Sequence, residues 1–267
     1  MNSLRNHLRA VGRLGALIAV LVGFGLSYAV NRRHRRDATS RARWLQRACR
    51  QALRALAIEV EVRGQPVGGV LVAANHLSYL DILVLAAQTP VVFVAKREVR
   101  SWAVFGWYAE RAGTRFLDRS RSADLRRIVE EMSQVLAAEL SLVVFLEGTT
   151  SGGAGVFPFK SSLLEPAVRQ GWRVMPAALD YAVPAGHCLA TEVCWWGEMR
   201  LVPHLWHLMT LPWVVARVGW GEPFPAGGER KALAEVLHAK VVGLRRTDAA
   251  QASSPSFQAE PAAGWRG

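Results

Sequence analysis

His76 and Asp81 lie five residues apart, directly after the apolar run at residues 70–74, and their side chains can cooperate in proton transfer. A buried strand that ends on His76 would present the imidazole at the carboxyl edge of a sheet. Asp81 then falls in the first turn of the next helix, where it can hold the ring in one tautomer and stabilise the imidazolium. The pair is a candidate general base with its orienting carboxylate. The structural alternative is a capping box formed by Ser78 and Asp81.

Further polar groups follow other apolar runs. Arg119 closes a loop, and its guanidinium could fork onto a phosphate, although a surface ion pair with Asp118 is the alternative. Residues 145–153 are a buried strand that breaks into a loop of glycines and hydroxyls, whose amides could cradle an anion. No Gly-Lys-Ser/Thr follows, so this is not an ATP loop. Residues 174–179 form an apolar strand whose internal Pro176 is best placed at an edge or a bulge beside a cavity.

Residues 58–246 alternate short β-branched runs with helical stretches, which predicts an α/β domain with a mostly buried central sheet flanked by helices. Strands are expected at residues 58–62, 70–74, 91–95, 142–146, 174–179, 193–196 and 213–220. Helices are expected at residues 81–88, 101–112, 121–140, 161–170 and 229–246. Residues 247–267 are rich in Ala, Ser, Pro and Gln, and we expect a disordered tail there.

Residues 1–36 predict a single transmembrane anchor with basic flanks. Residues 14–30 carry no charge, and arginines lie on both sides of them. As a helix this run spans about 26 Å, at the short end for a hydrocarbon core of about 30 Å. The arginine cluster behind it predicts, by the positive-inside rule, that the following domain lies at the cytoplasmic face of the inner (plasma) membrane. A cleaved signal peptide is the alternative.

Residues 37–57 predict a basic amphipathic helix. Trp44 and several leucines and alanines recur at helical spacing, and five arginines occupy the remaining surface. Such a helix suits the headgroup region of an anionic membrane. The alternative is an ordinary surface helix packed on the domain.

The composition favours a membrane-associated protein with an anionic partner. The formal net charge is +12, ten residues are tryptophan, and 51% of the residues are hydrophobic. The three cysteines have no metal-ligand spacing, so we infer no metal. RNA binding would need aromatics interleaved with basic residues on a sheet, whereas these tryptophans cluster beside apolar residues, so no nucleic-acid partner is expected. A peripheral membrane-binding protein without catalysis is the alternative from another class.

Taken together, the motifs resemble those of the glycerolipid acyltransferase family in their order and approximate spacing. The matching residues are Asn75, His76 and Asp81; Phe116, Leu117, Asp118 and Arg119; residues 145–151; and Val174, Met175 and Pro176. The likeness covers residues 69–224. Within the family, the chain resembles the bacterial branch that acylates 1-acyl-glycerol-3-phosphate. All four motifs together are specific for this family.

The resemblance implies an O-acyltransferase in which His76 is the base and Asp81 its partner. The residues that it places at the substrates are Arg119, Glu147, Gly148, Thr149 and Pro176. Arg119, Glu147 and Gly148 would lie in the acceptor phosphate site, and Pro176 would border the acyl donor. The donor would be acyl-CoA or acyl carrier protein, and no cofactor is implied.

The acceptor implied first is the lysolipid 1-acyl-glycerol-3-phosphate, but two positions depart from the family pattern. Leu146 stands where proline is frequent, and Thr150 stands where arginine is frequent, which removes a cation from the phosphate site. The loop is also similar to the branch that includes lyso-ornithine lipid acyltransferases, whose acceptor carries no phosphate. That acceptor is the alternative. A serine hydrolase is disfavoured because no Gly-x-Ser-x-Gly elbow is present.

Overall fold

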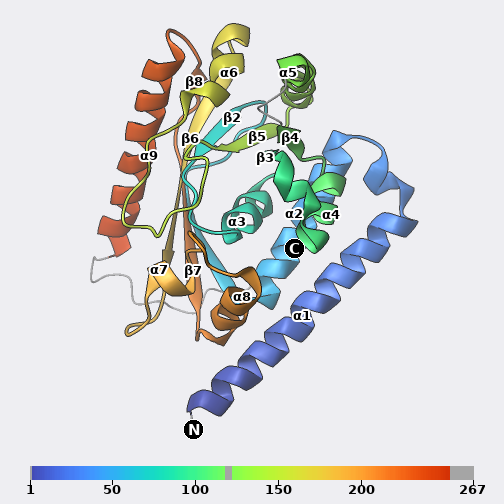
Figure 1. Cartoon of the computed structure of the whole chain (residues 1–267), viewed down its shortest axis with the longest axis vertical. Helices are drawn as coiled ribbons and strands as arrows, with labels where there is room; N and C mark the ends of the chain where they lie inside the picture. The colour runs from blue at the N-terminus through green and yellow to red at the C-terminus, as the bar shows by residue number, and fades with distance from the viewer. Residues whose placement is uncertain (1, 118–121, 253–267) are drawn as a thin grey trace.

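The computed structural model describes residues 2–117 and 122–252, and its centre is one mixed sheet (Figure 1). The strands run in the order β1-β7-β6-β2-β5-β3-β4, with β8 paired to β6. They are β1 (Ile58–Arg63), β2 (Leu71–Ala74), β3 (Val91–Lys96), β4 (Arg115–Leu117), β5 (Ser141–Phe145), β6 (Arg173–Ala182), β7 (Val214–Trp220) and β8 (Phe224–Pro225). The pairing is parallel except where β6 meets β7 and β8.

Helices cover both faces of the sheet. On one face lie α1 (Asn2–Val30), α2 (Ala38–Ala55), α3 (Leu80–Gln88), α4 (Ala103–Ala112) and α8 (Leu201–Thr210). On the other lie α5 (Ser122–Ala137), α6 (Glu165–Gln170) and α9 (Arg230–Ala252). Shorter elements are η1 (Arg32–Arg35), η2 (Arg97–Ser101), η3 (Ser161–Leu163) and α7 (Leu189–Glu192).

Strand β2 shows why the sheet is buried on both sides. Val72 and Ala74 pack into the apolar cluster beneath α3, and Leu71 and Ala73 pack into the cluster beneath α5 and α9. Side chains alternate between the faces of a strand, so a continuous apolar run fills two cores at once. The expected α/β fold with a mostly buried sheet is confirmed.

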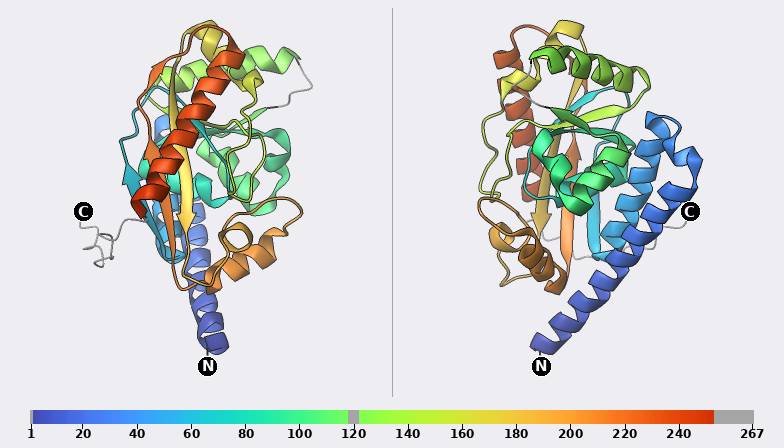
Figure 2. Two further views of the ribbon diagram at one scale, coloured as in Figure 1. Left: turned by 90° about the vertical axis from the view of Figure 1, so that its left-hand side faces the viewer. Right: turned by 45° about the vertical axis from the view of Figure 1, so that its right-hand side comes forward.

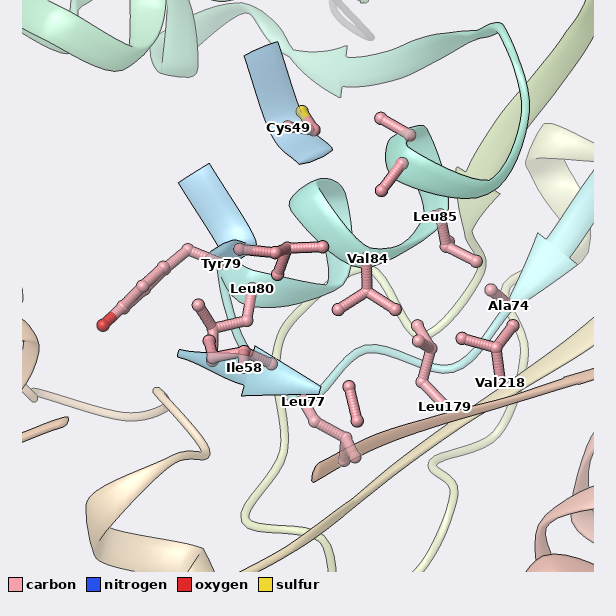
Figure 3. Close-up of a cluster of buried hydrophobic side chains, with 14 of the residues drawn as sticks. Cys49, Ile58, Ala74, Leu77, Tyr79, Leu80, Val84, Leu85, Leu179 and Val218 are labelled. Carbon is pink, nitrogen blue, oxygen red and sulfur yellow. The ribbon is translucent and has the colours of Figure 1, made fainter. Parts of the chain in front are cut away.

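The core beneath α3 fixes the position of the loop that follows β2. Leu80 and Val84 of α3 belong to one buried cluster with Leu179 of β6, Val218 of β7 and Ala74 at the end of β2, and Val84 points toward Leu179 (Figure 3). Leu80 and Val84 are fully buried. Their burial holds the first turn of α3 against the carboxyl end of β2.

Six of the seven expected strands are present, and the one at residues 193–196 is wrong. This segment is irregular and follows α7. Val193 and Cys194 are fully buried, so the apolar pattern there reflects packing rather than a strand. The next residue bonds to the loop after β2, because the Trp195 backbone N–H donates to the Leu77 carbonyl at 2.8 Å.

The expectation that Pro176 lies at a sheet edge is also wrong, because β6 is an interior strand. Pro176 lies opposite Ala73 of β2, and on its other side the partner of β6 changes from β8 at Val174 to β7 at Ala177. The Pro176 carbonyl accepts from Gly221 on that side. A missing N–H is tolerated there because it faces the junction between two partner strands.

The last helix differs from the expectation at its end. Helix α9 continues to Ala252, so a disordered tail from residue 247 is wrong for residues 247–252. These residues include three alanines, the best helix formers, which extend the helix before Ser and Pro appear. The rest of the expected tail, residues 253–267, lies outside the described residues.

The two N-terminal helices form as expected. Helix α2, however, is the surface helix packed on the domain that was the alternative to a helix in the headgroup region. Ser3–Val30 is long and apolar enough to cross a membrane by length and composition. In α2 the apolar face is turned into the protein: Trp44 is fully buried and Leu45 nearly so, while Arg43 and Arg47 are exposed. Helix α2 therefore packs on the domain and cannot place its apolar face in lipid.

Helix α1 runs along the outside of the domain (Figure 2) and bonds to α8, α2 and α4, the last through the Tyr108 hydroxyl and the Leu21 carbonyl. Near its start, Arg9 and Arg13 donate to carbonyls at the end of α8, with Arg9 to Thr210 at 2.7 Å and Arg13 to Leu211 at 2.7 Å. Near its end, the Trp44 indole donates to the Phe24 carbonyl at 3.2 Å. These bonds join α1 to α8 and to α2.

Candidate active site

His76 follows the carboxyl end of β2, and its imidazole lies between an aromatic ring and a carboxylate. The ring stacks on Phe145, the last residue of β5, at 3.9 Å between centroids and 9° between planes. Its Nδ1 lies 2.7 Å from Asp81 Oδ2. The side chain is 18% exposed. Because Nδ1 faces the carboxylate, the atom left to meet a substrate is Nε2.

Asp81 lies in the first turn of α3 and is fully buried. Its Oδ2 also accepts the backbone N–H groups of Leu77 at 2.6 Å and Ser78 at 3.0 Å. Three donors around one oxygen stabilise the ionised carboxylate. The Ser78 hydroxyl has no hydrogen-bond partner within the described residues, so the reciprocal capping box is not formed. One carboxylate thus orders the loop and holds the imidazole.

Tyr181 supplies a further donor from β6. Its hydroxyl donates to Asp81 Oδ1 at 2.6 Å, across 100 residues of sequence. The ring is 3% exposed. Burial, followed by the nearby Asp81 charge, raises the pKa of Tyr181 well above its ordinary value, so the hydroxyl keeps its proton.

Asn75 fixes the residue before the histidine. Its side-chain amide donates to the Leu179 carbonyl at 2.9 Å and accepts from the Leu179 N–H at 2.7 Å. Asn75 is fully buried, and both of these bonds reach β6. The loop after β2 is therefore attached to β6 at Asn75 and again at Asp81.

Glu147 is 2% exposed and binds two backbone amides. Oε1 accepts from the N–H of His76 at 2.7 Å, and Oε2 accepts from the N–H of Phe157 at 2.8 Å. Burial raises the pKa of the Glu147 carboxyl, and these two hydrogen bonds oppose that rise. In this structure the carboxylate links the loop after β5 to His76.

The glycine-rich loop after β5 lies beside the histidine. The Ser151 N–H donates to the His76 carbonyl at 2.9 Å, and the Gly148 N–H donates to the Phe145 carbonyl at 3.1 Å. These two amides are therefore used within the protein. Thr149, exposed between them, has its side chain at the surface.

Glycine is favoured at position 148 by its positive φ, and a lysine side chain lies against its Cα. Gly148 has φ +73°, and a Cβ there would lie 2.7 Å from Lys160 Nζ. The Lys160 N–H donates to the Leu146 carbonyl at 2.8 Å, which folds residues 157–160 back over the loop. The exposed ammonium of Lys160 thus lies against Gly148, the residue after Glu147.

Arg245 of α9 holds the far end of the same loop. Its Nη2 donates to the Gly153 carbonyl at 2.5 Å and pairs with Asp180 of β6 at 3.1 Å. Both side chains of the ion pair are less than one-sixth exposed. The loop is therefore fixed to the sheet at Ser151 and to α9 at Gly153.

The structure brings His76, Asp81, Glu147, Gly148 and Thr149 to one edge of the sheet. Arg119 lies outside the described residues. Pro176 is buried one position before the end of β2, in the strand that also carries Tyr181. Within the described residues, no group of three or more His, Cys, Asp and Glu side chains could hold a metal ion.

Sequence reasoning missed Tyr181, named Asn75 only as part of a motif and expected Lys160 as a second cation only if its loop folds back. Tyr181 has no local signal, because the apolar stretch around it reads as an ordinary strand and its partner is 100 residues away. Asn75 stands next to the histidine, and a buried amide in that place is a detectable signal for a backbone clamp. Lys160 becomes a site residue only once the loop is seen to fold back.

Comparison with known families gives one family match. The model of the family described as Acyltransferase matches residues 58–180, which contain His76, Asp81 and Glu147. The matched stretch runs from β1 to β6. It therefore covers the strands and loops that build the site.

Curated relatives fall into two groups by name. A 1-acyl-sn-glycerol-3-phosphate acyltransferase of Neisseria meningitidis is 36% identical over 63% of this chain and 67% of its own length. A lyso-ornithine lipid O-acyltransferase of Pseudomonas aeruginosa is 35% identical over 85% of this chain and 88% of its own length. A third relative, from Brucella abortus and also named lyso-ornithine lipid O-acyltransferase, is 36% identical over 66% of this chain and 70% of its own.

Among solved structures, the fold is similar to the crystal structure of the 1-acyl-sn-glycerophosphate (LPA) acyltransferase PlsC of Thermotoga maritima. The TM-score is 0.69 and the identity is 21%. The match covers 93% of this chain and 98% of that one. It therefore includes the N-terminal helices as well as the sheet.

Proposed function

This chain belongs to the acyltransferase family, and we propose that it transfers a fatty acyl group from acyl-CoA or acyl carrier protein to the free hydroxyl of a lysolipid. The observation that carries the proposal is the buried Asp81 carboxylate at 2.7 Å from His76 Nδ1. Family relatives named for two lysolipid acceptors support the substrate class. The products belong to membrane lipid synthesis.

The proposed mechanism uses His76 as general base. With Nδ1–H donated to Asp81, Nε2 accepts the proton of the lysolipid hydroxyl as its oxygen attacks the thioester carbonyl. The tetrahedral intermediate collapses by breaking the carbon–sulfur bond, and His76 returns the proton to the departing thiol. The products are the acylated lipid and the free thiol of the carrier. No protein nucleophile and no cofactor take part in this mechanism.

The first acceptor that we propose is 1-acyl-glycerol-3-phosphate. Lys160 Nζ lies against Gly148 and offers a cation to a phosphate beside the glycine-rich loop. Arg119 is the second expected cation, and the exposed Thr149 is an expected contact to the same anion. Glu147 is 2% exposed and binds two backbone amides, so we assign it to bracing His76. Pro176 is the expected border of the acyl donor.

Lyso-ornithine lipid is the second acceptor candidate. It is favoured by Thr150, which stands where the family often carries arginine. The Pseudomonas aeruginosa relative, named for this acceptor, aligns over more of the chain than the Neisseria meningitidis relative does. A phosphate-free acceptor needs fewer cations in its site.

Purified protein assayed with labelled acyl-CoA or acyl carrier protein and a panel of lysolipids tests the activity. We expect transfer by the wild type and a loss of about 10²–10⁴-fold in His76→Ala, the usual contribution of a general base. His187→Ala, which changes a surface histidine beside Glu192, should keep the wild-type rate. A His76→Ala rate above about a tenth of wild type contradicts the mechanism.

Lys160→Met separates the two acceptors in the same assay. With a phosphate acceptor, kcat/KM should fall about 30-fold, because a charge-assisted hydrogen bond contributes about 2 kcal/mol. With lyso-ornithine lipid the change should be small. Arg119→Ala tests the second cation, and Lys231→Met at the surface of α9 is the matched control. Robust transfer to lyso-ornithine lipid and none to 1-acyl-glycerol-3-phosphate would reverse the order of the two acceptors.

For the location we propose the cytoplasmic face of the inner membrane, with α1 as the attachment. Exposed apolar side chains recur along one side of the helix from start to end: Leu4, Leu8, Val11, Ile18, Val22, Leu26 and Val30. Spacings of three and four residues place such side chains on one stripe. The opposite side of α1 packs on the domain through Ala10, Leu14, Leu17 and Phe24.

A further inference from the structure

The two oxygens of the Asp81 carboxylate have different partners. Oδ2 faces the His76 imidazole and the N–H groups of Leu77 and Ser78. Oδ1 accepts from the Tyr181 hydroxyl at 2.6 Å. The two oxygens define the plane of the carboxylate. A donor on each oxygen therefore opposes rotation of the carboxylate about the Cβ–Cγ bond of Asp81.

Tyr181 belongs to the strand that already holds the other side of the histidine. Its strand, β6, pairs with β2 through Ala177 and then continues past the end of β2. Leu179 clamps Asn75 there, and Tyr181, two residues further, reaches Asp81. Antiparallel pairing of Leu179 with Val218 and of Tyr181 with Ala216 fixes this end of β6 against β7. The residues on both sides of the catalytic loop are thus attached to one rigid strand.

We propose that Tyr181 is a positioning residue for acyl transfer, whose hydroxyl fixes the Asp81 carboxylate and through it the tautomer and direction of the His76 imidazole. This inference rests on the function of His76 proposed above. Tyr181 is 3% exposed, and its hydroxyl points to Asp81. Its effect on the reaction passes through Asp81.

The hydroxyl also adjusts how strongly Asp81 favours a charged imidazole. A donor on Oδ1 takes part of the carboxylate charge away from Oδ2. Removing it concentrates that charge toward His76, so the pH profile of the reaction reports its loss. Titratable groups that interact with this carboxylate include Glu147 and Cys194, and Tyr79 lies near the Tyr181 ring. Burial raises the pKa of Cys194 to about 12, so this thiol stays neutral.

A purely structural function is the competing interpretation, since any buried tyrosine hydroxyl needs an acceptor. Tyr79 provides the matched case. It is 7% exposed, lies two residues before Asp81 and bonds through its hydroxyl to His204 Nδ1 at 3.1 Å. Tyr79→Phe and Tyr181→Phe therefore remove the same atom from similarly buried rings, but only the second change touches Asp81.

The experiment measures kcat, KM for the lysolipid, the pH profile of kcat/KM and the thermal midpoint for the wild type and both variants of the full chain. For Tyr181→Phe we expect kcat to fall about tenfold with KM unchanged within about twofold. The midpoint of the acidic limb should rise by about half a pH unit. For Tyr79→Phe the kinetics and the pH profile should match the wild type.

Three results would overturn the proposal. One is a Tyr181→Phe enzyme with wild-type kcat and pH profile; another is a loss of rate in both variants with no shift of the acidic limb. The third is a Tyr181→Phe protein that does not fold while Tyr79→Phe does, because this assigns the hydroxyl to stability. Absence of acyl transfer by the wild type, or an active His76→Ala variant, would instead contradict the proposed function.

Discussion

At the scale of the residue, Asp81 combines two functions that sequence reasoning treats as alternatives. A carboxylate in the first turn of a helix can cap the loop before it or orient a histidine. Here Oδ2 does both, since it accepts the N–H of Ser78 and faces Nδ1 of His76. The loop that carries the histidine is thus ordered by the group that would stabilise its charge.

Glu147 accepts two backbone N–H groups, so its substitution should be tested for an effect on stability. Glu147→Gln is expected to lower the free energy of unfolding by about 2 kcal/mol, because an amide nitrogen would replace one of two buried acceptors. The N–H of His76 or of Phe157 would then lack a partner. Urea denaturation measures the effect.

Glu165→Gln is the matched control for this change. Glu165 lies on α6 in exposed ion pairs with Arg169 and Arg230, where little change in stability is expected. Equal stability of the two glutamine variants would contradict the bracing of His76 by Glu147. It would leave hydroxyl binding as the function of the carboxylate.

Site residues could be predicted from the sequence where residues that act together are also close along the chain. His76 and Asp81 are five residues apart and end an apolar strand, so one stretch contains the whole signal. Tyr181 bonds to Asp81 across 100 residues, and only the register of β6 beside β2 brings them together. A single sequence does not contain that register.

At the scale of the element, α8 is fixed to the active-site loop through a histidine. His204 is 6% exposed, donates from Nε2 to the Cys194 carbonyl at 3.0 Å and accepts from Tyr79 at Nδ1 at 3.1 Å. With Tyr79 as the donor to Nδ1, the ring is the neutral tautomer that carries its proton on Nε2. Burial lowers the pKa of His204, in agreement with a neutral ring.

The stability of the protein should therefore fall as the pH falls. In the unfolded chain a histidine takes up a proton near about pH 6.5, whereas the folded state resists it, so the contribution of neutral His204 is present above that pH and lost below it. We expect the thermal midpoint to drop between about pH 7.5 and about pH 5.5, and to drop less in His204→Gln. Thermal unfolding at both values measures this.

His207→Gln controls for histidines at the surface of the same helix. His207 is 54% exposed and pairs with Glu192, so its substitution should leave the pH dependence close to wild type or steepen it. An equal drop in the wild type and in His204→Gln would show that another group is responsible. That result would show that His204 does not cause the fall of the thermal midpoint at low pH.

Strands and helices could be predicted where the local periodicity of the sequence determines their type. The predictions were wrong where tertiary packing determines the structure instead. The strands at residues 58–62 and 213–220 follow from β-branched runs. The segment at residues 193–196 has the same apolar character but fills space beneath the loop after β2 without pairing. Pro176 fits in an interior strand because the partner of β6 changes there from β8 to β7. No local sequence pattern encodes this change of partner.

At the scale of the whole molecule, the exposed stripe of α1 predicts how the protein attaches to membranes. Ile18→Asp and Val22→Asp should each reduce co-sedimentation with vesicles that contain anionic lipid, because an aspartate in the apolar region costs about 3 kcal/mol. Both side chains are at least half exposed, so the fold should be preserved. A vesicle sedimentation assay at low and high salt measures attachment.

Val236→Asp is the control for an added charge on an exposed apolar position. Val236 is 45% exposed on α9, on the opposite face of the sheet, and should not affect binding. Unchanged sedimentation of Ile18→Asp and Val22→Asp would contradict attachment through α1. It would direct attention to the arginines exposed on α2.

The pairing of β1 with β7 sets the order in which a growing chain can become active. β1 meets its partner across 156 residues, as in the ion pair of Glu61 with Arg217, and within residues 2–117 and 122–252 no other strand pairs with it. At about 5–20 residues per second, synthesis of the intervening chain takes roughly 10–30 s. Helices α1 and α2 are synthesised before that interval, and β6 with Tyr181 is synthesised within it. A nascent chain can therefore reach the membrane before it can acylate anything.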